Sequence, residues 1–373
     1  MHRSNSNSSS NSSSQPVGGK VILLGTPGEE GTIGGKILLL DRGAYYSSSS
    51  SPSSLSTSAS TPLSNSTSHP KKAKPQNTIT LISHPSLYNN SPEIHTAQFS
   101  RLTASYTGVP SHAANTPWLA RNALDATITS YTSLSLLRQQ THPSTILSLA
   151  IPDSGSPLTN IIHSHSKLTI VARSHPVQSQ SSHSSLEAKI ASCLRAGGLA
   201  TGCETEIEIT EGYRDHVPNL MLARRYASNW NSIPLLDDKK PPSDPDPNPQ
   251  IPIAEDRPVY VNASTDQGNL SHTMPSINVS FAIPPGPEGG PPHTPDFVKA
   301  AGTREAFERA LGVGKALAGT AVDVLTIPGL FEEVKAQWRR DMDAVKQRER
   351  NDPSKNDPSK DAVVFAEAPR REC

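Results

Sequence analysis

The chain has 373 residues, a formal net charge of zero and a hydrophobic fraction of 34%. A net charge of zero argues against a protein held on nucleic acid or on an anionic membrane by bulk electrostatics. No apolar run is long enough to span a bilayer, and the N-terminus lacks the apolar stretch of a secretory signal. The three cysteines form no CxxC pair, which fits a reducing setting. We therefore expect a cytoplasmic protein that binds neither nucleic acid nor membrane.

Several segments have compositions that cannot bury enough apolar surface to offset the entropy of ordering. We expect disorder in the Ser/Asn-rich residues 1–17, the Ser-rich insert 47–76, the Pro-rich insert 232–257 and the charged tail 346–373. The other segments hold enough apolar side chains for two modest cores.

Residues 18–97 have the pattern of the first part of an α/β domain. The short apolar run 20–25 predicts a buried strand, residues 35–43 predict a helix, and residues 77–83 predict a second strand that runs into His84. Strand, helix and strand in this order are typical of an α/β fold.

Residues 98–212 have a different periodicity. Alternating apolar positions predict strands near 99–106, 144–151, 168–172 and 206–209. A helical spacing after Pro117 predicts a helix that buries Leu124, Ile128, Tyr131 and Leu134. A capping box at 184–187 predicts the start of a second helix, with Leu186, Ile190 and Leu194 inward. The order βαββαβ predicts a ferredoxin-like domain.

The α/β pattern returns over residues 213–345. Alternation at 277–281 predicts a strand, and an Ala/Leu-rich stretch predicts a helix over 303–320. A helix over 330–345 presents one apolar face, which consists of Leu330, Val334, Trp338 and Met342. One α/β domain, 18–97 and 213–345, is thus interrupted by an inserted small domain, 98–212.

The stretch GTPGEEGTIGGK, residues 25–36, sets Glu29 and Glu30 among five glycines. A Walker A loop is excluded because position 30 is Glu instead of Gly and position 37 is Ile instead of Ser or Thr. The alternative is metal-assisted hydrolysis, in which one carboxylate binds a divalent cation and its neighbour takes a proton from the activated water. On spacing alone, a solvated pair of loop glutamates is the commoner arrangement.

The wider pattern resembles a known family. KVILLGTPGEEGTIGGKILLLDRGAYY is similar to the zinc-carboxylate segment of the aminoacylase/carboxypeptidase-type dizinc metallopeptidases. Further stretches agree in order: LISHP, YTGVPSHAANTPWLARNALDA, ATGCETEIE before GYRDHVPNLMLARRY, and STDQGNLSHTMPSI followed by HTPDF. The resemblance is strongest to the amidohydrolase and β-alanyl-lysine dipeptidase branch and covers residues 18–345 apart from the inserts. It implies a zinc-peptidase-like catalytic α/β domain with an inserted lid or dimerisation domain.

The resemblance also implies roles for single residues. Glu29 matches the general base, and Glu30, His84 and His293 match metal ligands. Imidazole and carboxylate ligands suit one or two zinc ions, with manganese or cobalt as alternatives. His112 matches a histidine that reaches across the dimer in relatives and stabilises the developing oxyanion.

Other positions match groups that touch substrate or line the cleft in relatives. Asn122, Asn160 and Arg173 match groups that contact substrate or line the cleft. In the segment STDQGNLSH, the residues Asp266, Asn269 and His272 match groups that shape the cleft. Each has an ordinary structural alternative, such as a helix start, a strand end or a loop hydrogen bond. The resemblance further implies a homodimer formed through residues 98–212.

One departure from the family pattern concerns the N-terminus. Relatives carry a metal-binding segment upstream of the Glu-Glu motif, which is a His-x-Asp or a Cys-Gly-His run. In this sequence, His2 is the one histidine or cysteine among residues 1–17. We expect an N-terminally truncated catalytic domain of an enzyme that hydrolyses the amide bond of an N-acyl amino acid or a β-alanyl-lysine-like dipeptide. The alternative is a non-catalytic fragment or degenerate homologue that dimerises with an intact relative and modulates it.

Overall fold

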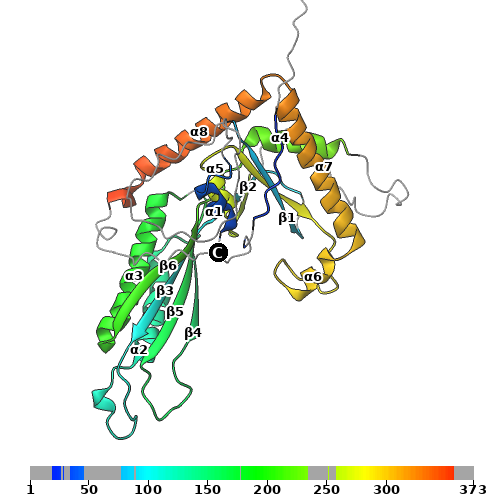
Figure 1. Cartoon of the computed structure of the whole chain (residues 1–373). Coiled ribbons are helices and arrows are strands. Elements are labelled where there is room, and N and C mark those ends of the chain that lie inside the picture. Colours follow the sequence, from blue (N-terminus) through cyan, green and yellow to red (C-terminus); the bar gives the residue numbers. More distant parts are fainter. Residues whose placement is uncertain are drawn as a thin grey trace, which may run out of the picture.

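The computed structural model of the chain describes residues 19–26, 28, 34–45, 77–87, 90–176, 178–233, 251 and 258–356. The segments 1–17 and 47–76, for which disorder was predicted, lie outside these residues, as do most of 232–257 and the end of the chain from 357. In Figure 1 the long strands β3–β6, with α2 and α3, extend away from the part that contains β1, β8, α4 and α7.

The part with β1 and β8 is a parallel strand pair covered by helices. Strands β1 (Thr80–Ser86) and β8 (Ser276–Ala282) pair in parallel, with Thr80 opposite Ser276. The surrounding helices are α1 (Gly35–Asp41), α4 (Leu220–Asn231), α5 (Gln267–Ser271), α6 (Pro295–Ala301), α7 (Arg304–Thr326) and α8 (Leu330–Asn351). The apolar faces of α4, α6, α7 and α8 share one core with the two strands, which includes Leu222, Tyr226, Trp230, Ile277, Val279, Val313 and Val334. Helices α1 and α5 form a separate small cluster, which includes Leu39, Leu270 and Met274.

Two predicted strands in this part need correction. Residues 20–25 form no strand, and Val21, Ile22 and Leu23 are 72%, 58% and 98% exposed. A strand needs a neighbour for its backbone N–H and C=O groups, and no described strand pairs with this run. The strand predicted at 77–83 is β1, which lies three residues further along and includes His84. Its boundaries follow its partner, because β1 pairs with β8 over its whole length.

The other part has the predicted order βαββαβ. Its elements are β3 (Gln98–Thr107), α2 (Ala123–Leu137), β4 (Ile146–Asp153), β5 (His165–Ser174), α3 (Gln180–Thr201) and β6 (Glu204–Tyr213). The four strands form an antiparallel sheet in the order β4-β5-β3-β6. The side chains that alternate inward pack against both helices in a second core, which includes Leu102, Ala104, Leu134, Leu168, Ile170, Ile190 and Leu194.

Helix α2 exists as predicted, but the expected buried face is wrong in part. Leu134 is fully buried, whereas Ile128 is 49% exposed and Tyr131 is 40% exposed. The inner face carries small residues because α2 and α3 approach closely: a Cβ on Gly197 would lie 2.4 Å from the Ala126 carbonyl oxygen. At Gly197 there is no room for a large side chain between the two backbones, whereas Ile128 and Tyr131 lie on the outer face.

Helix α3 begins at Gln180, earlier than the predicted capping box at 184–187. The actual N-cap is Ser179, whose side chain accepts a hydrogen bond from the backbone N–H of Ser182. The backbone N–H of Ser181 donates a hydrogen bond of 3.1 Å to the carboxylate of Glu349 on helix α8. The first turn is thus completed by a residue that is distant in sequence.

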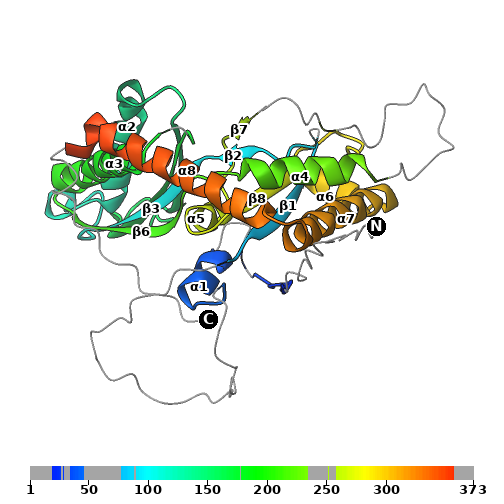
Figure 2. The ribbon, with the colours of Figure 1, turned by 90° about the horizontal axis from the view of Figure 1, so that it is seen from above.

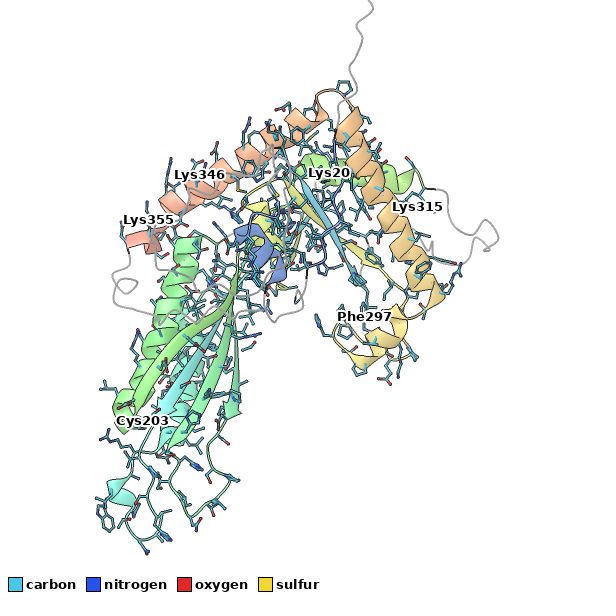
Figure 3. The ribbon with its side chains drawn as sticks, viewed as in Figure 1. Lys20, Cys203, Phe297, Lys315, Lys346 and Lys355 are labelled. Atoms are coloured by element: carbon cyan, nitrogen blue, oxygen red, sulfur yellow. The ribbon has the colours of Figure 1, made fainter. Side chains whose placement is uncertain are left out.

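Helix α8 links the two parts. Near its start the Val334 carbonyl accepts a hydrogen bond from Asn219, and Trp338 donates to the Ser271 carbonyl at 2.8 Å. Near its end, Arg348 donates to the Pro176 carbonyl at 3.1 Å, next to the start of α3. Figure 2 shows α8 running from the end of α7 to α3, and Figure 3 shows Lys346 and Lys355 at that end and Cys203 at the opposite end of α3. Residues 346–356, predicted as part of a disordered tail, therefore continue this helix and the 3-10 turn η3 (Pro353–Asn356).

Smaller elements complete the described structure. They are the parallel pair β2 (Ile94–Thr96) and β7 (Val259–Val261), and the 3-10 turns η1 (Pro117–Leu119) and η2 (Arg138–Gln140). Ile251, inside the predicted Pro-rich insert, is buried and bonded to Asn231 through both backbone groups. Among the described helices none alone has the length and hydropathy of a membrane span, although α7 and α8, bent by 104°, pass that test as a pair.

Candidate metal and catalytic site

Two predicted metal ligands lie close in sequence to the ends of the parallel strands, one near the end of β1 and one after β8. His84 is the fifth residue of β1, and His293 lies in the loop that leads from β8 to α6. Because β1 and β8 are parallel, their carboxyl ends lie at one edge. Ligand and metal sites of α/β sheets form outside the carboxyl ends of their strands.

His84 is oriented by a side chain on the neighbouring strand. Its Nδ1 lies 2.8 Å from the Oδ1 of Asn278, a residue of β8 that is 5% exposed. An amide oxygen accepts hydrogen bonds only, so Nδ1 carries the proton and Nε2 is the basic nitrogen of the neutral ring. Histidines that bind a metal commonly donate their other ring N–H to an oxygen in this way, which fixes the tautomer and the ring orientation.

Of the other predicted metal ligands, His293 alone lies within the described residues. His293 is exposed and has a positive φ of 70°, which is uncommon for a residue other than glycine. Glu29 and Glu30 lie outside the described residues. No three His, Cys, Asp or Glu side chains come together as a metal-binding group within the described residues. Histidine is a common zinc ligand, and the oriented His84 fits that role. The carboxylate ligand Glu30 stays a prediction from the sequence.

His112 and Asn160 lie next to each other at the far end of the four-stranded part. The two segments are joined by an antiparallel bridge between His112 and Ile161, and by a hydrogen bond of 2.9 Å from the Ala113 N–H to the Asn160 carbonyl. Both predicted residues are exposed. The Nδ1 of His112 accepts backbone hydrogen bonds from Ala114 and Asn115, so Nε2 is the protonated ring nitrogen in the neutral form.

The other two predicted substrate residues have structural contacts. The Oδ1 of Asn122 accepts hydrogen bonds from the first backbone N–H groups of α2 at 3.0 and 3.4 Å, so Asn122 is the N-cap of that helix. Arg173 in β5 donates to the Ser264 hydroxyl at 2.6 Å and stacks over the Phe99 ring at 4.9 Å. This contact ties the four-stranded sheet to the segment that precedes α5.

The segment STDQGNLSH forms a set of buried hydrogen bonds. Asp266 accepts from the backbone N–H and the ammonium of Lys36. The Asn269 side chain accepts from the Arg214 N–H at 2.9 Å. His272 lies 2.9 Å from an Asp215 carboxylate oxygen. These contacts, with Lys36 of α1 and with residues 214 and 215 after β6, match the structural alternative given for this segment. A role of the segment in shaping the cleft stays a prediction.

Three polar residues that shape this region were not predicted from the sequence. Asn278 orients His84, Asp215 bonds His272, and His216 is fully buried with Nδ1 2.8 Å from the Ile94 carbonyl oxygen. Burial lowers the pKa of His216 to about 4. Burial alone would raise the pKa of Asp215, but His272 and nearby arginines outweigh it and leave that pKa below its usual value. The Arg-Asp-His run at 214–216 is the sequence signal that could have drawn attention to two of them.

Comparisons with known proteins bear on this arrangement. No family model matches the chain. It is 32% identical over 322 residues to the Xaa-Arg dipeptidase of Mus musculus, a match that covers 86% of this chain and 62% of that protein. It is 22% identical over 276 residues to a p-aminobenzoyl-glutamate hydrolase component of Escherichia coli, covering 63% of this chain and 56% of that protein. The chain thus spans less than two thirds of the length of the curated relatives it matches. The structure of an aminobenzoyl-glutamate utilization protein from Klebsiella pneumoniae aligns with a TM-score of 0.43 and 12% identity over 66% of this chain and 54% of that one.

Proposed function

Because the chain belongs to the aminoacylase/carboxypeptidase-type family of amidohydrolases and dipeptidases, we propose that the protein hydrolyses the amide bond of a dipeptide or an N-acyl amino acid. Two relatives are named Xaa-Arg dipeptidases. A β-alanyl-lysine-like substrate resembles an Xaa-Arg dipeptide in having a basic C-terminal residue. The proposed substrate class is therefore a dipeptide with a basic C-terminal residue. The observation that carries the proposal is the orientation of His84 by Asn278 at the carboxyl edge of β1 and β8.

In this proposal the carboxyl edge holds one or two divalent cations, preferably zinc. His84, His293 and Glu30 are the ligands. A zinc ion held there would act as a Lewis acid and would lower the pKa of a bound water to near neutrality. Glu29 accepts the proton as the water attacks the amide carbonyl and then delivers it to the leaving amine. Asn278 keeps the basic nitrogen of His84 directed outward by bonding the opposite ring nitrogen.

The four-stranded part is the proposed lid and dimerisation domain. His112 of one protomer serves the site of its partner by stabilising the developing negative charge on the carbonyl oxygen. Asn160, next to His112, and Arg173 are the proposed substrate contacts, whereas Asn122 acts through the start of α2. Two free thiols in this part, Cys193 and Cys203, suit the reducing, cytoplasmic setting that we propose.

Two features of the proposed lid support a homodimer. The outer face of α2 exposes Ile128 and Tyr131 one turn apart, and β4 is an edge strand of the sheet. An exposed edge strand offers unpaired backbone groups to a second copy. Ile128→Lys should weaken dimerisation at least tenfold, since a buried isoleucine contributes about 1.5–3 kcal/mol. Leu199→Lys, which alters an 87% exposed position on α3, is the control, and sedimentation of both variants at tens of micromolar is the measurement. Equal behaviour of the two variants would contradict this interface.

Zinc binding and hydrolysis test the proposed reaction separately. Zinc affinity, measured by competition with a chromophoric chelator, should fall at least tenfold in His84→Ala and Glu30→Gln and stay within twofold in Glu29→Gln. Release of arginine or lysine from dipeptides by the zinc-loaded protein should fall by about 10² to 10⁴ in Glu29→Gln. Zinc binding that is indifferent to His84 would overturn the proposed site.

A further inference from the structure

A buried ion pair joins the start of α1 to the segment before α5. The ammonium of Lys36 lies 2.5 Å from one carboxylate oxygen of Asp266, and the backbone N–H of Lys36 donates to the other oxygen at 2.9 Å. The two side chains are 4% and 0% exposed. One carboxylate therefore binds the same residue twice, once through its side chain and once through its backbone.

The backbone hydrogen bond completes the first turn of α1. Helix α1 starts after Gly34, which has a positive φ of 57° and no side chain with which to cap the helix. The first N–H groups of a helix need acceptors from outside it, and here Asp266 supplies one from a position 230 residues away. A negative charge at this end also suits the helix dipole.

The same segment is bonded to the strands of the proposed metal site. Gln267, next to Asp266, donates through Nε2 to the hydroxyl of Thr80 at 3.0 Å and to that of Ser276 at 2.6 Å. These are the first residues of β1 and β8 and lie opposite each other in the pair. A continuous set of hydrogen bonds therefore connects Lys36 to the strand that carries His84 and to the strand that leads to His293.

We propose that Lys36 and Asp266 are positioning residues, which fix the start of α1, the element that follows Glu29 and Glu30 in the sequence, relative to the strand that carries His84 and the strand that precedes His293. Lys36 follows Glu30 by six positions in the sequence, so the anchored residue ends the segment that bears both carboxylates. This inference rests on the proposed function for the roles of those carboxylates. The anchoring itself is a contact between described residues and can be tested without it.

A buried tyrosine lies near the pair. The ring of Tyr45 lies in the small apolar cluster with Leu270 and Met274. Burial together with the negative charge of Asp266 raises the pKa of Tyr45 to about 12. The pair is thus buried beside a neutral phenol, and a buried charge that has lost its partner is poorly solvated.

The test uses three variants of the full chain and one matched control. Lys36→Met removes the ammonium but leaves the backbone hydrogen bond. Asp266→Asn removes the carboxylate charge. The double variant carries neither charge, so it remains interpretable if Asp266→Asn alone leaves the Lys36 ammonium unpaired and fails to fold. Arg225→Met is the control because it breaks an ion pair with Asp323, 3.2 Å long, that ties α4 to α7 in the same part of the molecule.

Two measurements separate anchoring from positioning. Amide hydrogen exchange in residues 35–45 should accelerate at least tenfold in Asp266→Asn and in the double variant, while residues 77–87 change less than twofold. Zinc affinity should fall at least tenfold in the same variants and stay within twofold in Arg225→Met. A role confined to stability would lower the urea midpoint and leave zinc affinity unchanged.

Each outcome decides one part of the inference. Unchanged exchange in residues 35–45 would overturn the anchoring, and accelerated exchange with unchanged zinc affinity would overturn the positioning role. An unaltered chain that binds no zinc would overturn the proposed function and with it the positioning role, whereas the exchange data would still decide the anchoring.

Discussion

Acidification from pH 7 to pH 5 should lower the free energy of unfolding through two buried histidines. His183 and His216 are 1% and 0% exposed, and burial lowers the pKa of each ring from 6.5 to about 4. His183 lies between two hydroxyls, with Nδ1 2.6 Å from Ser174 Oγ and Nε2 3.0 Å from Ser100 Oγ. The Nε2 of His216 has no hydrogen-bond partner among the described residues. Burial therefore outweighs the contacts that would favour a second ring proton at either site.

The sign and size of the effect follow from proton linkage. The unfolded chain takes up a proton on each ring below a pH of about 6.5, whereas the folded chain does so only near pH 4. Stability is fully present above the unfolded pKa and is lost as the pH falls toward the folded pKa. At pH 5 the loss is about 2 kcal/mol for each histidine, or about 4 kcal/mol for both, out of about 5–15 kcal/mol for a typical domain. Burial raises the pKa of Glu187, 3.5 Å from His183 Nε2, which offsets part of the loss because the folded chain binds that proton more readily.

Urea titrations at pH 7, 6 and 5 measure this dependence. In His216→Gln the loss between pH 7 and pH 5 should shrink by about 2 kcal/mol, because the amide does not titrate. His142→Gln, at an exposed position, is the control and should leave the loss unchanged. A loss in His216→Gln as large as in the unaltered chain, or stability that rises toward pH 5, would refute the reasoning.

Three further predictions concern single contacts. Asn278→Ala should lower zinc affinity by about 10- to 100-fold because His84 loses its orienting hydrogen bond. Ser280→Ala, on the same strand, is the control, and equal zinc affinities of the two variants would refute the orienting role of Asn278. Tyr106→Phe should cost about 1 kcal/mol in urea unfolding, since the buried hydroxyl loses bonds of 2.7 and 3.0 Å to α2 and α3; an unchanged midpoint would count against those bonds. Gly197→Ala should cost about 1–3 kcal/mol because its methyl group would overlap the α2 backbone, and a stabilised variant would contradict the close approach of the two helices.

Local periodicity predicted most elements because it reflects burial of one face along a short stretch of chain. Strands β3, β5 and β8 were located from such patterns. Element ends were less predictable where a distant residue completes them. The first turn of α3 is satisfied by Glu349, and the extent of β1 is set by its pairing with β8. The apolar run 20–25 has the composition of a strand but no described partner strand, and composition alone does not supply one.

The sequence named candidate ligands, which stay predictions, but gave no indication of the contacts that support them. The family pattern pointed to His84 and His293, while the proton arrangement of His84 depends on Asn278, 194 residues away in the sequence. The anchoring of α1 by Asp266 spans 230 residues. Such pairs leave no local signal in the sequence, because the residues adjacent to each partner do not depend on the contact. The tertiary structure is what identifies them.

Helix α2 shows why a correct periodicity can still give the wrong buried surface. Its apolar positions recur at helical spacing, but the face toward α3 must be narrow enough for the close approach at Gly197. Small and polar residues, including Ala126 and Ser130, therefore occupy the interior, and the Ser130 hydroxyl is satisfied by the Leu194 carbonyl at 3.1 Å. Leu134 is buried further along the helix, but Ile128 and Tyr131 are left on the outside. An apolar stripe that the fold of one chain does not bury requires another surface to cover it, and the second copy in the proposed homodimer would supply that surface.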